Sequence, residues 1–161
     1  MRVRAMMQRH VVCLGPDDSL HEAYELMQEG GFRHIPITED GVLIGIVSDR
    51  DVLLQATQQD RVVLVPDMPL GDVMTKGVIT CATSARLADV ADTMVENKID
   101  ALPVTDGDGR LVGIVTSTDL LMLMGIRDHD LGQRPLPFTF RVERRGGGTK
   151  FMRNSQVRAS L

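Results

Sequence analysis

The chain has 161 residues, 43% of them hydrophobic, and a formal net charge of −4 at pH 7. Up to Gly132 it carries 21 Asp and Glu against 11 Lys and Arg, a net charge of −10, which argues against a duplex nucleic-acid surface on this part. The longest apolar stretch, Leu120 to Ile126, is too short to span a bilayer, and no apolar signal segment follows the N-terminus. We therefore expect a cytoplasmic protein with one domain-sized core and no membrane partner.

The first predicted elements are a strand and a helix. Val11 to Leu14 is a short apolar run closed by Gly15-Pro16, which predicts a strand and a turn. Asp18 or Ser19 can cap the helix that follows, which we expect to end at Gly30-Gly31. Its apolar positions have the i, i+3, i+4, i+7 spacing of one buried face. These positions are Leu20, Ala23, Tyr24 and Met27.

Two predicted strands come next, at His34 to Thr38 and at Val42 to Val47. Pro36 in the first is tolerated best at a sheet edge or a strand start. The second is almost unbroken in its apolar character, which is typical of a buried strand. It leads into Gly45-Ile46-Val47-Ser48-Asp49-Arg50-Asp51, the pattern of a strand entering a helix N-terminus, where unpaired N–H groups favour an anion such as phosphate.

This whole pattern occurs twice, at an offset of 67 residues that becomes 68 after the second turn. The helix stripe returns at Leu87, Val90, Ala91 and Met94, with Asn97 in the place of Gly30. The strands return at Ala101 to Thr105 and Leu111 to Val115, and the junction returns as Gly113-Ile114-Val115-Thr116-Ser117-Thr118-Asp119. Each copy is β-α-β-β-α, so the predicted fold class is α/β (α+β), with two tandem units packed with pseudo-two-fold symmetry.

The predicted boundaries follow from the repeat. Residues 1–60 form repeat one, 61–69 a linker, 70–126 repeat two and 127–161 a basic, partly disordered C-terminal tail. Between the repeats we expect a helix tail with polar Gln58-Gln59-Asp60, then the apolar run Val62 to Pro66. In the tail, Phe138 to Val142 alternates like one strand. Cys13 and Cys81 lack CxxC spacing, so we expect small buried side chains and no disulfide or metal site.

Two hypotheses fit the junctions. Ser48-x-x-Asp51 and Thr116-x-x-Asp119 have the spacing of a capping box, in which the hydroxyl accepts from a backbone N–H and the carboxylate reaches back to the cap. A helix start needs such a box whether or not a ligand binds. Spacing alone therefore leaves capping and ligand binding open.

An apolar-Pro-apolar strand, a Gly-containing turn and Gly-Ile-Val-(Ser/Thr)-x-x-Asp before a leucine-bearing helix, twice in tandem, resemble a pair of cystathionine β-synthase (CBS) domains. The resemblance covers about Met7 to Met124. It implies two clefts that hold adenosine-containing ligands such as AMP, ADP, ATP, S-adenosylmethionine or NAD, with no catalytic cofactor.

The resemblance also assigns residues to these sites. Asp51 and Asp119 would accept from the ribose hydroxyls, and Ser48 and Thr116 would lie beside the ribose or phosphate. Guanidinium and imidazolium groups make three further residues phosphate candidates. These are Arg33, His34 and Arg50. The adenine slot would be lined by Val12, Cys13, Ile35, Pro36, Ile79, Thr80, Leu102 and Pro103. Repeat two carries Asp100-Ala101 and Thr118 where repeat one has Arg33-His34 and Arg50, so we expect unequal sites.

We therefore expect a regulatory module that binds an adenine nucleotide, forms a homodimer and acts on a regulated protein that is a separate chain. Three other classes of function are alternatives to this one. An enzyme would use Asp51 and Asp119 as paired carboxylates, but they lie in opposite repeats without a Lys or His neighbour in sequence. A nucleic-acid binder would rely on the basic tail. A purely structural dimerisation module stays open because fold does not determine function.

Overall fold

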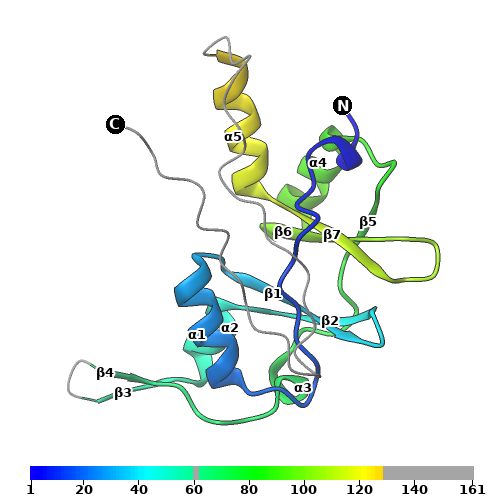
Figure 1. Cartoon of the computed structure of the whole chain (residues 1–161). Helices are drawn as coiled ribbons and strands as arrows, with labels where there is room; N and C mark the ends of the chain where they lie inside the picture. Colours follow the sequence, from blue (N-terminus) through cyan, green and yellow to red (C-terminus); the bar gives the residue numbers. More distant parts are fainter. Residues whose placement is uncertain (60–61, 129–161) are drawn as a thin grey trace. The chain divides into compact units, whose positions relative to one another are not determined.

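The computed structural model describes residues 1–59 and 62–128, which form two compact units (Figure 1). The repeat-one unit contains the described part of Val12–Val78. The repeat-two unit combines Met1–Val11 with residues 79–128. The compact units therefore differ from the sequence repeats, because the segment before each repeat belongs to the unit formed by the other one. The tail from residue 129 onward, with the strand predicted at Phe138 to Val142, lies outside the described residues.

The repeat-one unit is built around an antiparallel pair of strands. Its main elements are α1 (Leu20–Gly30), β1 (His34–Glu39), β2 (Val42–Ser48), α2 (Asp49–Gln55) and α3 (Leu70–Val73). Apolar side chains from all of these, together with Leu14, form its buried core. The core residues are Leu14, Leu20, Ala23, Met27, Ile35, Ile37, Val47, Val52 and Leu70.

Helix α1 has the predicted cap and the predicted buried face. The Ser19 hydroxyl accepts from the N–H of His21 at 3.1 Å, and the helix ends at Gly31, whose φ of 66° is left-handed. Leu20, Ala23 and Met27 are buried, as their spacing predicted, whereas Tyr24, the fourth residue of the predicted face, is only partly buried.

Helix α4 (Leu87–Asn97) of the repeat-two unit ends in the same way but with a different residue. The residue that adopts the left-handed conformation is Lys98, with φ 55°, at the position that Gly31 holds after α1. This conformation brings an L-residue's Cβ close to the backbone and costs roughly 1–2 kcal/mol, whereas glycine has no Cβ. The two helices thus end in the same conformation with different residues, and they also differ at the N-cap, where Arg86 of α4 makes no side-chain cap hydrogen bond.

We expect Lys98→Gly to raise the free energy of unfolding by up to about 1 kcal/mol, because the favourable φ outweighs the extra backbone entropy of glycine. Gly31→Ala should lower it by about 1 kcal/mol, since a Cβ at Gly31 meets no atom within 4 Å and only the backbone conformation is strained. Urea denaturation of both variants and the parent measures this. Destabilisation by Lys98→Gly would contradict the assigned C-cap.

The segment between the repeats differs from the prediction. Thr57–Gln59 and Val62–Leu64 form β3 and β4, an antiparallel hairpin that extends away from the rest of its unit in Figure 1. The predicted helix tail is therefore wrong at Gln58 and Gln59, because α2 stops at Gln55 and Ala56 is already extended, with ψ 149°. Asp60, the last residue of that prediction, lies outside the described residues. All described residues of β3 and β4 are exposed. Neither strand has a buried face, so the sequence lacks the alternation of apolar and polar residues that marks a half-buried strand.

The repeat-two unit has a three-stranded sheet in the order β5-β6-β7. Its elements are η1 (Val3–Ala5), β5 (Cys81–Ala82), α4, β6 (Ala101–Thr105), β7 (Leu111–Thr116) and α5 (Ser117–Asp128). β5 pairs in parallel with β6, and β6 pairs antiparallel with β7. Pro103 tolerates its place in this central strand because the two-residue β5 reaches only Val104 and Thr105, so no pairing is lost beside the proline.

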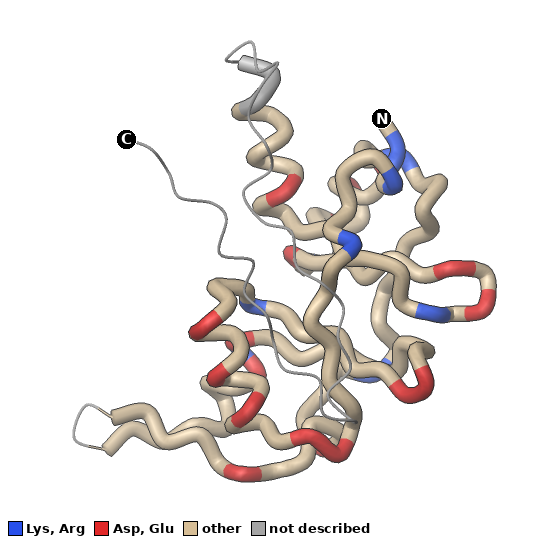
Figure 2. Tube along the Cα trace, viewed as in Figure 1, with Lys and Arg blue, Asp and Glu red and all other residues tan. Residues whose placement is uncertain are grey.

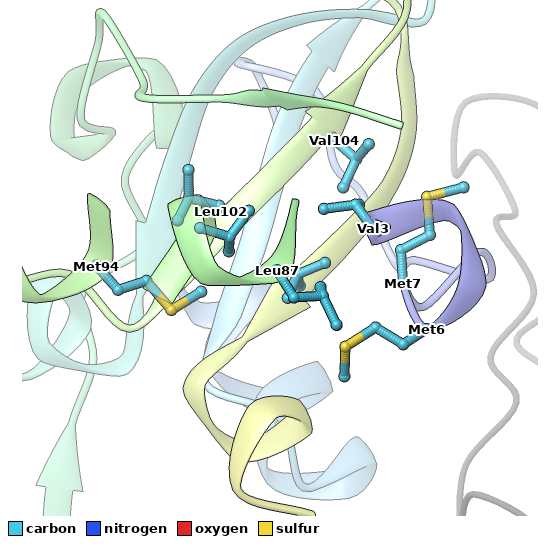
Figure 3. Close-up of a cluster of buried hydrophobic side chains, with 9 residues drawn as sticks. Val3, Met6, Met7, Leu87, Met94, Leu102 and Val104 are labelled. Carbon is cyan, nitrogen blue, oxygen red and sulfur yellow. The ribbon is translucent and has the colours of Figure 1, made fainter. Parts of the chain in front are cut away.

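The N-terminal segment completes the core of the repeat-two unit. Val3, Met6 and Met7 are all buried, and Figure 3 shows Val3 and Met6 of the N-terminal turn beside Leu87 of α4. Backbone bonds fix the segment in place, from the Val3 N–H to the Ala85 carbonyl at 2.9 Å and from the Leu87 N–H to the Met1 carbonyl at 3.2 Å. The corresponding bond in the repeat-one unit runs from the Leu20 N–H to the Met68 carbonyl at 2.8 Å.

The strand predicted at Val11 to Leu14 is reduced to isolated bridge positions at Cys13 and Leu14, of which Leu14 pairs in parallel with Ile37. The physical reason is that this run is divided between the two units. Val11 packs with Ala101 and Ile114 in the repeat-two unit, whereas Leu14 lies in the core of the repeat-one unit, so this run passes from one unit into the other.

Candidate functional site

The junction of β2 and α2 forms a complete capping box. Asp51 Oδ2 accepts from the Ser48 backbone N–H at 2.7 Å and from the Ser48 hydroxyl at 2.8 Å. The Ser48 hydroxyl oxygen accepts from the Asp51 N–H at 3.3 Å. The sequence prediction of a cap at this position is confirmed.

The junction of β7 and α5 repeats this geometry. Asp119 Oδ2 accepts from the Thr116 N–H and from the Thr116 hydroxyl, each at 2.8 Å, and Thr116 Oγ1 accepts from the Asp119 N–H at 3.3 Å. Asp119 is 7% exposed, one of only two buried polar or charged residues in the described part of the chain.

The two aspartates differ at their second carboxylate oxygen. Asp119 Oδ1 accepts from the Gln8 side-chain amide at 3.0 Å, a bond between residues 111 positions apart. Asp51 Oδ1 accepts no hydrogen bond from any residue that the structure describes. Both boxes therefore use one oxygen of the aspartate, which leaves Oδ1 of the half-buried Asp51 able to accept from a ligand. Asp51 can therefore cap the helix with one oxygen and accept from a ligand with the other. The two hypotheses that the spacing left open do not exclude each other at this residue.

The structure brings the other polar candidates of repeat one to the same junction. His34, the first residue of β1, is the register partner of Ser48, and the Arg33 carbonyl accepts from the Asp49 N–H at 2.9 Å. Arg33 and Arg50 are exposed. In repeat two the Asp100 carbonyl accepts from the Ser117 N–H at 2.9 Å, so Asp100 lies where Arg33 lies in repeat one. The two junctions share a backbone and differ in the charge around it.

The candidates for the adenine slot fall into two groups. Buried residues come from the strands and the segment before α1, and they are Cys13, Ile35, Pro36, Leu102 and Pro103. Val12 is half-buried, whereas Ile79 and Thr80 are exposed, in a stretch without regular structure before β5. The carbonyl of Pro36 already accepts from the Leu14 N–H at 3.2 Å, so this backbone group is engaged within its unit.

Gln8 is the residue of this region that sequence reasoning missed. Its only signal is its register, because Gln8 follows Met7 as Thr75 follows Met74. The contact with Asp119 depends on the exchange of leading segments, which no local pattern in the sequence reveals.

The remaining chemistry is limited. Burial raises the pKa of the Cys81 thiol, which keeps it protonated at neutral pH and lowers its value as a nucleophile or metal ligand. Among residues 1–59 and 62–128 there is no group of three His, Cys, Asp or Glu side chains suited to a metal ion. In the same residues no helix has the length and apolar character needed to cross a membrane. Figure 2 shows acidic positions spread over helices and turns, and basic ones along the N-terminal segment, which carries Arg2, Arg4 and Arg9.

The family model described as "CBS domain" matches this chain twice, over residues 3–56 and 70–125. The chain belongs to the CBS domain family. The predicted resemblance is confirmed, and so is the mixed α/β fold of a CBS domain pair. Both matches include a junction, ending just beyond Asp51 and Asp119.

Three known CBS proteins are similar to this chain in sequence or in fold. The CBS domain-containing protein YhcV of Bacillus subtilis is 33% identical over 118 residues, which cover 73% of this chain and 81% of YhcV. The crystal structure of the CBS domain pair of protein MJ0100, in complex with 5′-methylthioadenosine and S-adenosyl-L-methionine, is 27% identical with a TM-score of 0.67, covering 79% of this chain and 98% of that one. The structure of CBSX2 in complex with AMP is 26% identical with a TM-score of 0.68, covering 80% and 98%.

Proposed function

We propose that this CBS pair is a regulatory module that binds an adenosine-containing ligand and acts on a separate protein according to its occupancy. The observation that carries the proposal is Oδ1 of Asp51, which accepts no hydrogen bond from the described residues and is held at a helix start by a capping box that uses only the other oxygen. A ribose diol offers hydroxyl donors that such an oxygen accepts. Relatives with the same fold have been crystallised with AMP, S-adenosyl-L-methionine and 5′-methylthioadenosine, which share the adenosine unit.

The charge at the repeat-one junction supports a phosphorylated ligand. The side chains of Arg33 and Arg50 are exposed. Arg33 directly precedes β1, which begins at His34, and Arg50 lies on α2. Positive groups around a junction favour an anionic substituent on the same ligand that bonds Asp51. Asp100 in repeat two has the opposite charge, so we propose that repeat one supplies the principal site for a nucleotide.

We further propose a homodimer. In each unit the helix after the junction exposes large apolar side chains, which are Leu53 and Leu54 on α2 and Leu121 and Met124 on α5. Their exposed fractions run from 57% to 76%, which is costly for a face that remains in water. A purely structural dimer would use the same helices, so ligand binding is the property that separates the two functions.

A thermal-shift panel of AMP, ADP, ATP, NAD and S-adenosylmethionine tests the proposal. A ligand present at 100 times its dissociation constant stabilises the native state by roughly 2.7 kcal/mol, which raises the midpoint by several degrees for a chain of this size. We expect at least one of the five to do so, with adenine alone giving a smaller shift because it lacks the ribose. If none of the five moves the midpoint, the structural dimerisation module is the better description.

A further inference from the structure

Gln8 is held against Asp119 by its backbone as well as its side chain. The Gln8 N–H donates to the Ile114 carbonyl and the Ile114 N–H donates to the Gln8 carbonyl, both at 2.9 Å. This bridge fixes the segment beside β7, and the buried Met7 anchors it on the N-terminal side. The side-chain amide then reaches Asp119 Oδ1 at 3.0 Å. The contact is a built feature of the repeat-two unit.

The contact with Gln8 limits what the carboxylate of Asp119 can still accept. Its Oδ2 already accepts two hydrogen bonds from Thr116, its Oδ1 accepts the amide of Gln8, and the residue is 7% exposed. Oδ1 has a second acceptor position, but the small exposed surface of Asp119 leaves a ribose hydroxyl little room to reach it beside the Gln8 amide. Binding at Asp119 exchanges one hydrogen bond for another, whereas binding at Asp51 adds one.

Thr75 occupies the position in the repeat-one unit that Gln8 occupies in the repeat-two unit. It forms the same backbone bridge in the repeat-one unit, donating to the Ile46 carbonyl at 2.9 Å and accepting from the Ile46 N–H at 3.1 Å. Its side chain is shorter and makes no hydrogen bond within the described residues, and Asp51 Oδ1 is correspondingly unoccupied. At this position the two sites differ by one side chain, which comes from outside the repeat concerned.

We infer that Gln8 determines the ligand affinity of the repeat-two site, because its amide must leave Asp119 before a ribose hydroxyl can bind there. The inference rests on the proposed function and specifies how one of its two sites is regulated. Because coupling between two equilibria is reciprocal, a nucleoside bound at Asp119 also weakens the hold of the repeat-two unit on the N-terminal segment. The segment and the ligand compete for one oxygen.

Calorimetry with AMP on the full chain tests this with three proteins: the parent, Asp51→Ala, and Asp51→Ala combined with Gln8→Met. The Asp51 substitution leaves Asp119 as the ribose acceptor, and methionine keeps the length of glutamine without its donor. We expect the double variant to bind AMP at least about tenfold more tightly than Asp51→Ala, since a buried carboxylate oxygen left without a donor is satisfied by the ligand. The gain should be smaller for 2′-deoxy-AMP. Thr75→Val, the matched control, should change AMP affinity less than twofold.

A measurement on the unmodified chain covers the case in which the variant does not fold. In a ¹⁵N correlation spectrum, the side-chain amide signals of Gln8, assigned by their loss in Gln8→Met or Gln8→Ala, should shift when AMP saturates the protein. Unshifted Gln8 amide signals beside a shifted Asp119 backbone signal overturn the inference, and so does an AMP affinity that Gln8→Met leaves equal or lowers while the parent binds AMP. If no protein of the set binds AMP, the proposed function is overturned for AMP and the inference with it.

Discussion

Replacing Asp51 with alanine is expected to weaken AMP binding by about ten- to a hundredfold and also to lower the free energy of unfolding by about 1 kcal/mol. The affinity falls because Oδ1, the oxygen proposed to accept a ribose hydroxyl, is gone. The stability falls because Oδ2 is the acceptor for the N–H and the hydroxyl of Ser48. Calorimetry of the ligand complex and urea denaturation of the empty protein measure the two effects separately.

Asp119→Ala is the matched control. Compared with Asp51→Ala, it should lose more stability and less AMP affinity. This substitution removes the same two cap bonds and also leaves the amide of Gln8 without its acceptor, so the loss of stability should exceed that of Asp51→Ala. The loss of AMP affinity should be the smaller of the two, because Asp119 begins with its second oxygen occupied. Full AMP affinity in Asp51→Ala together with a large loss in Asp119→Ala would show that the principal site had been assigned to the wrong repeat.

Gly113→Ala is expected to destabilise the protein by about 1–3 kcal/mol, which lowers the thermal midpoint by about 3–10 °C. A Cβ on Gly113 would lie 2.8 Å from the carbonyl oxygen of Gln8 and 3.0 Å from the sulfur of Met7. The carbonyl belongs to the two-bond bridge with Ile114, so it cannot move away without breaking that bridge. The substitution should loosen the N-terminal segment specifically, which faster hydrogen exchange at the Gln8 and Ile114 amides would show.

The equivalent substitution in repeat one, Gly45→Ala, should cost less. The three atoms nearest to its Cβ would all belong to the side chain of Met74, namely the sulfur, Cγ at 2.8 Å and Cβ at 3.1 Å. A methionine side chain can change rotamer to relieve this contact, whereas a hydrogen-bonded peptide group cannot. Equal losses in the two variants, measured by urea denaturation under the same conditions, would argue against backbone contact as the role of Gly113.

The elements that sequence predicted well are those whose signal is local. The apolar spacing of α1, the glycine that ends it and the hydroxyl-x-x-acid spacing at Ser48 and Thr116 each depend on residues within one or two turns. A repeated pattern reinforced each of them. The fold of both repeats and the position of both capping boxes followed from that information.

The features that sequence did not predict depend on contacts between distant residues or on exposure. Nothing near Gln8 indicates that its partner is Asp119, and the role of Gly45 and Gly113 becomes visible only when a neighbouring segment is seen to approach them. The β3–β4 hairpin has no buried face, so its alternation carried no signal. Lys98 adopts a left-handed conformation that its residue type disfavours, so no residue-type signal marks the end of α4.

The exchange of leading segments means that one copy of the repeat cannot complete a unit by itself. The repeat-two unit needs Val3, Met6 and Met7 from the start of the chain, and the repeat-one unit needs Leu70 from the start of the second copy. Two separate fragments, divided between β3 and β4, would each hold a piece that the other requires, and they should therefore reassemble when mixed.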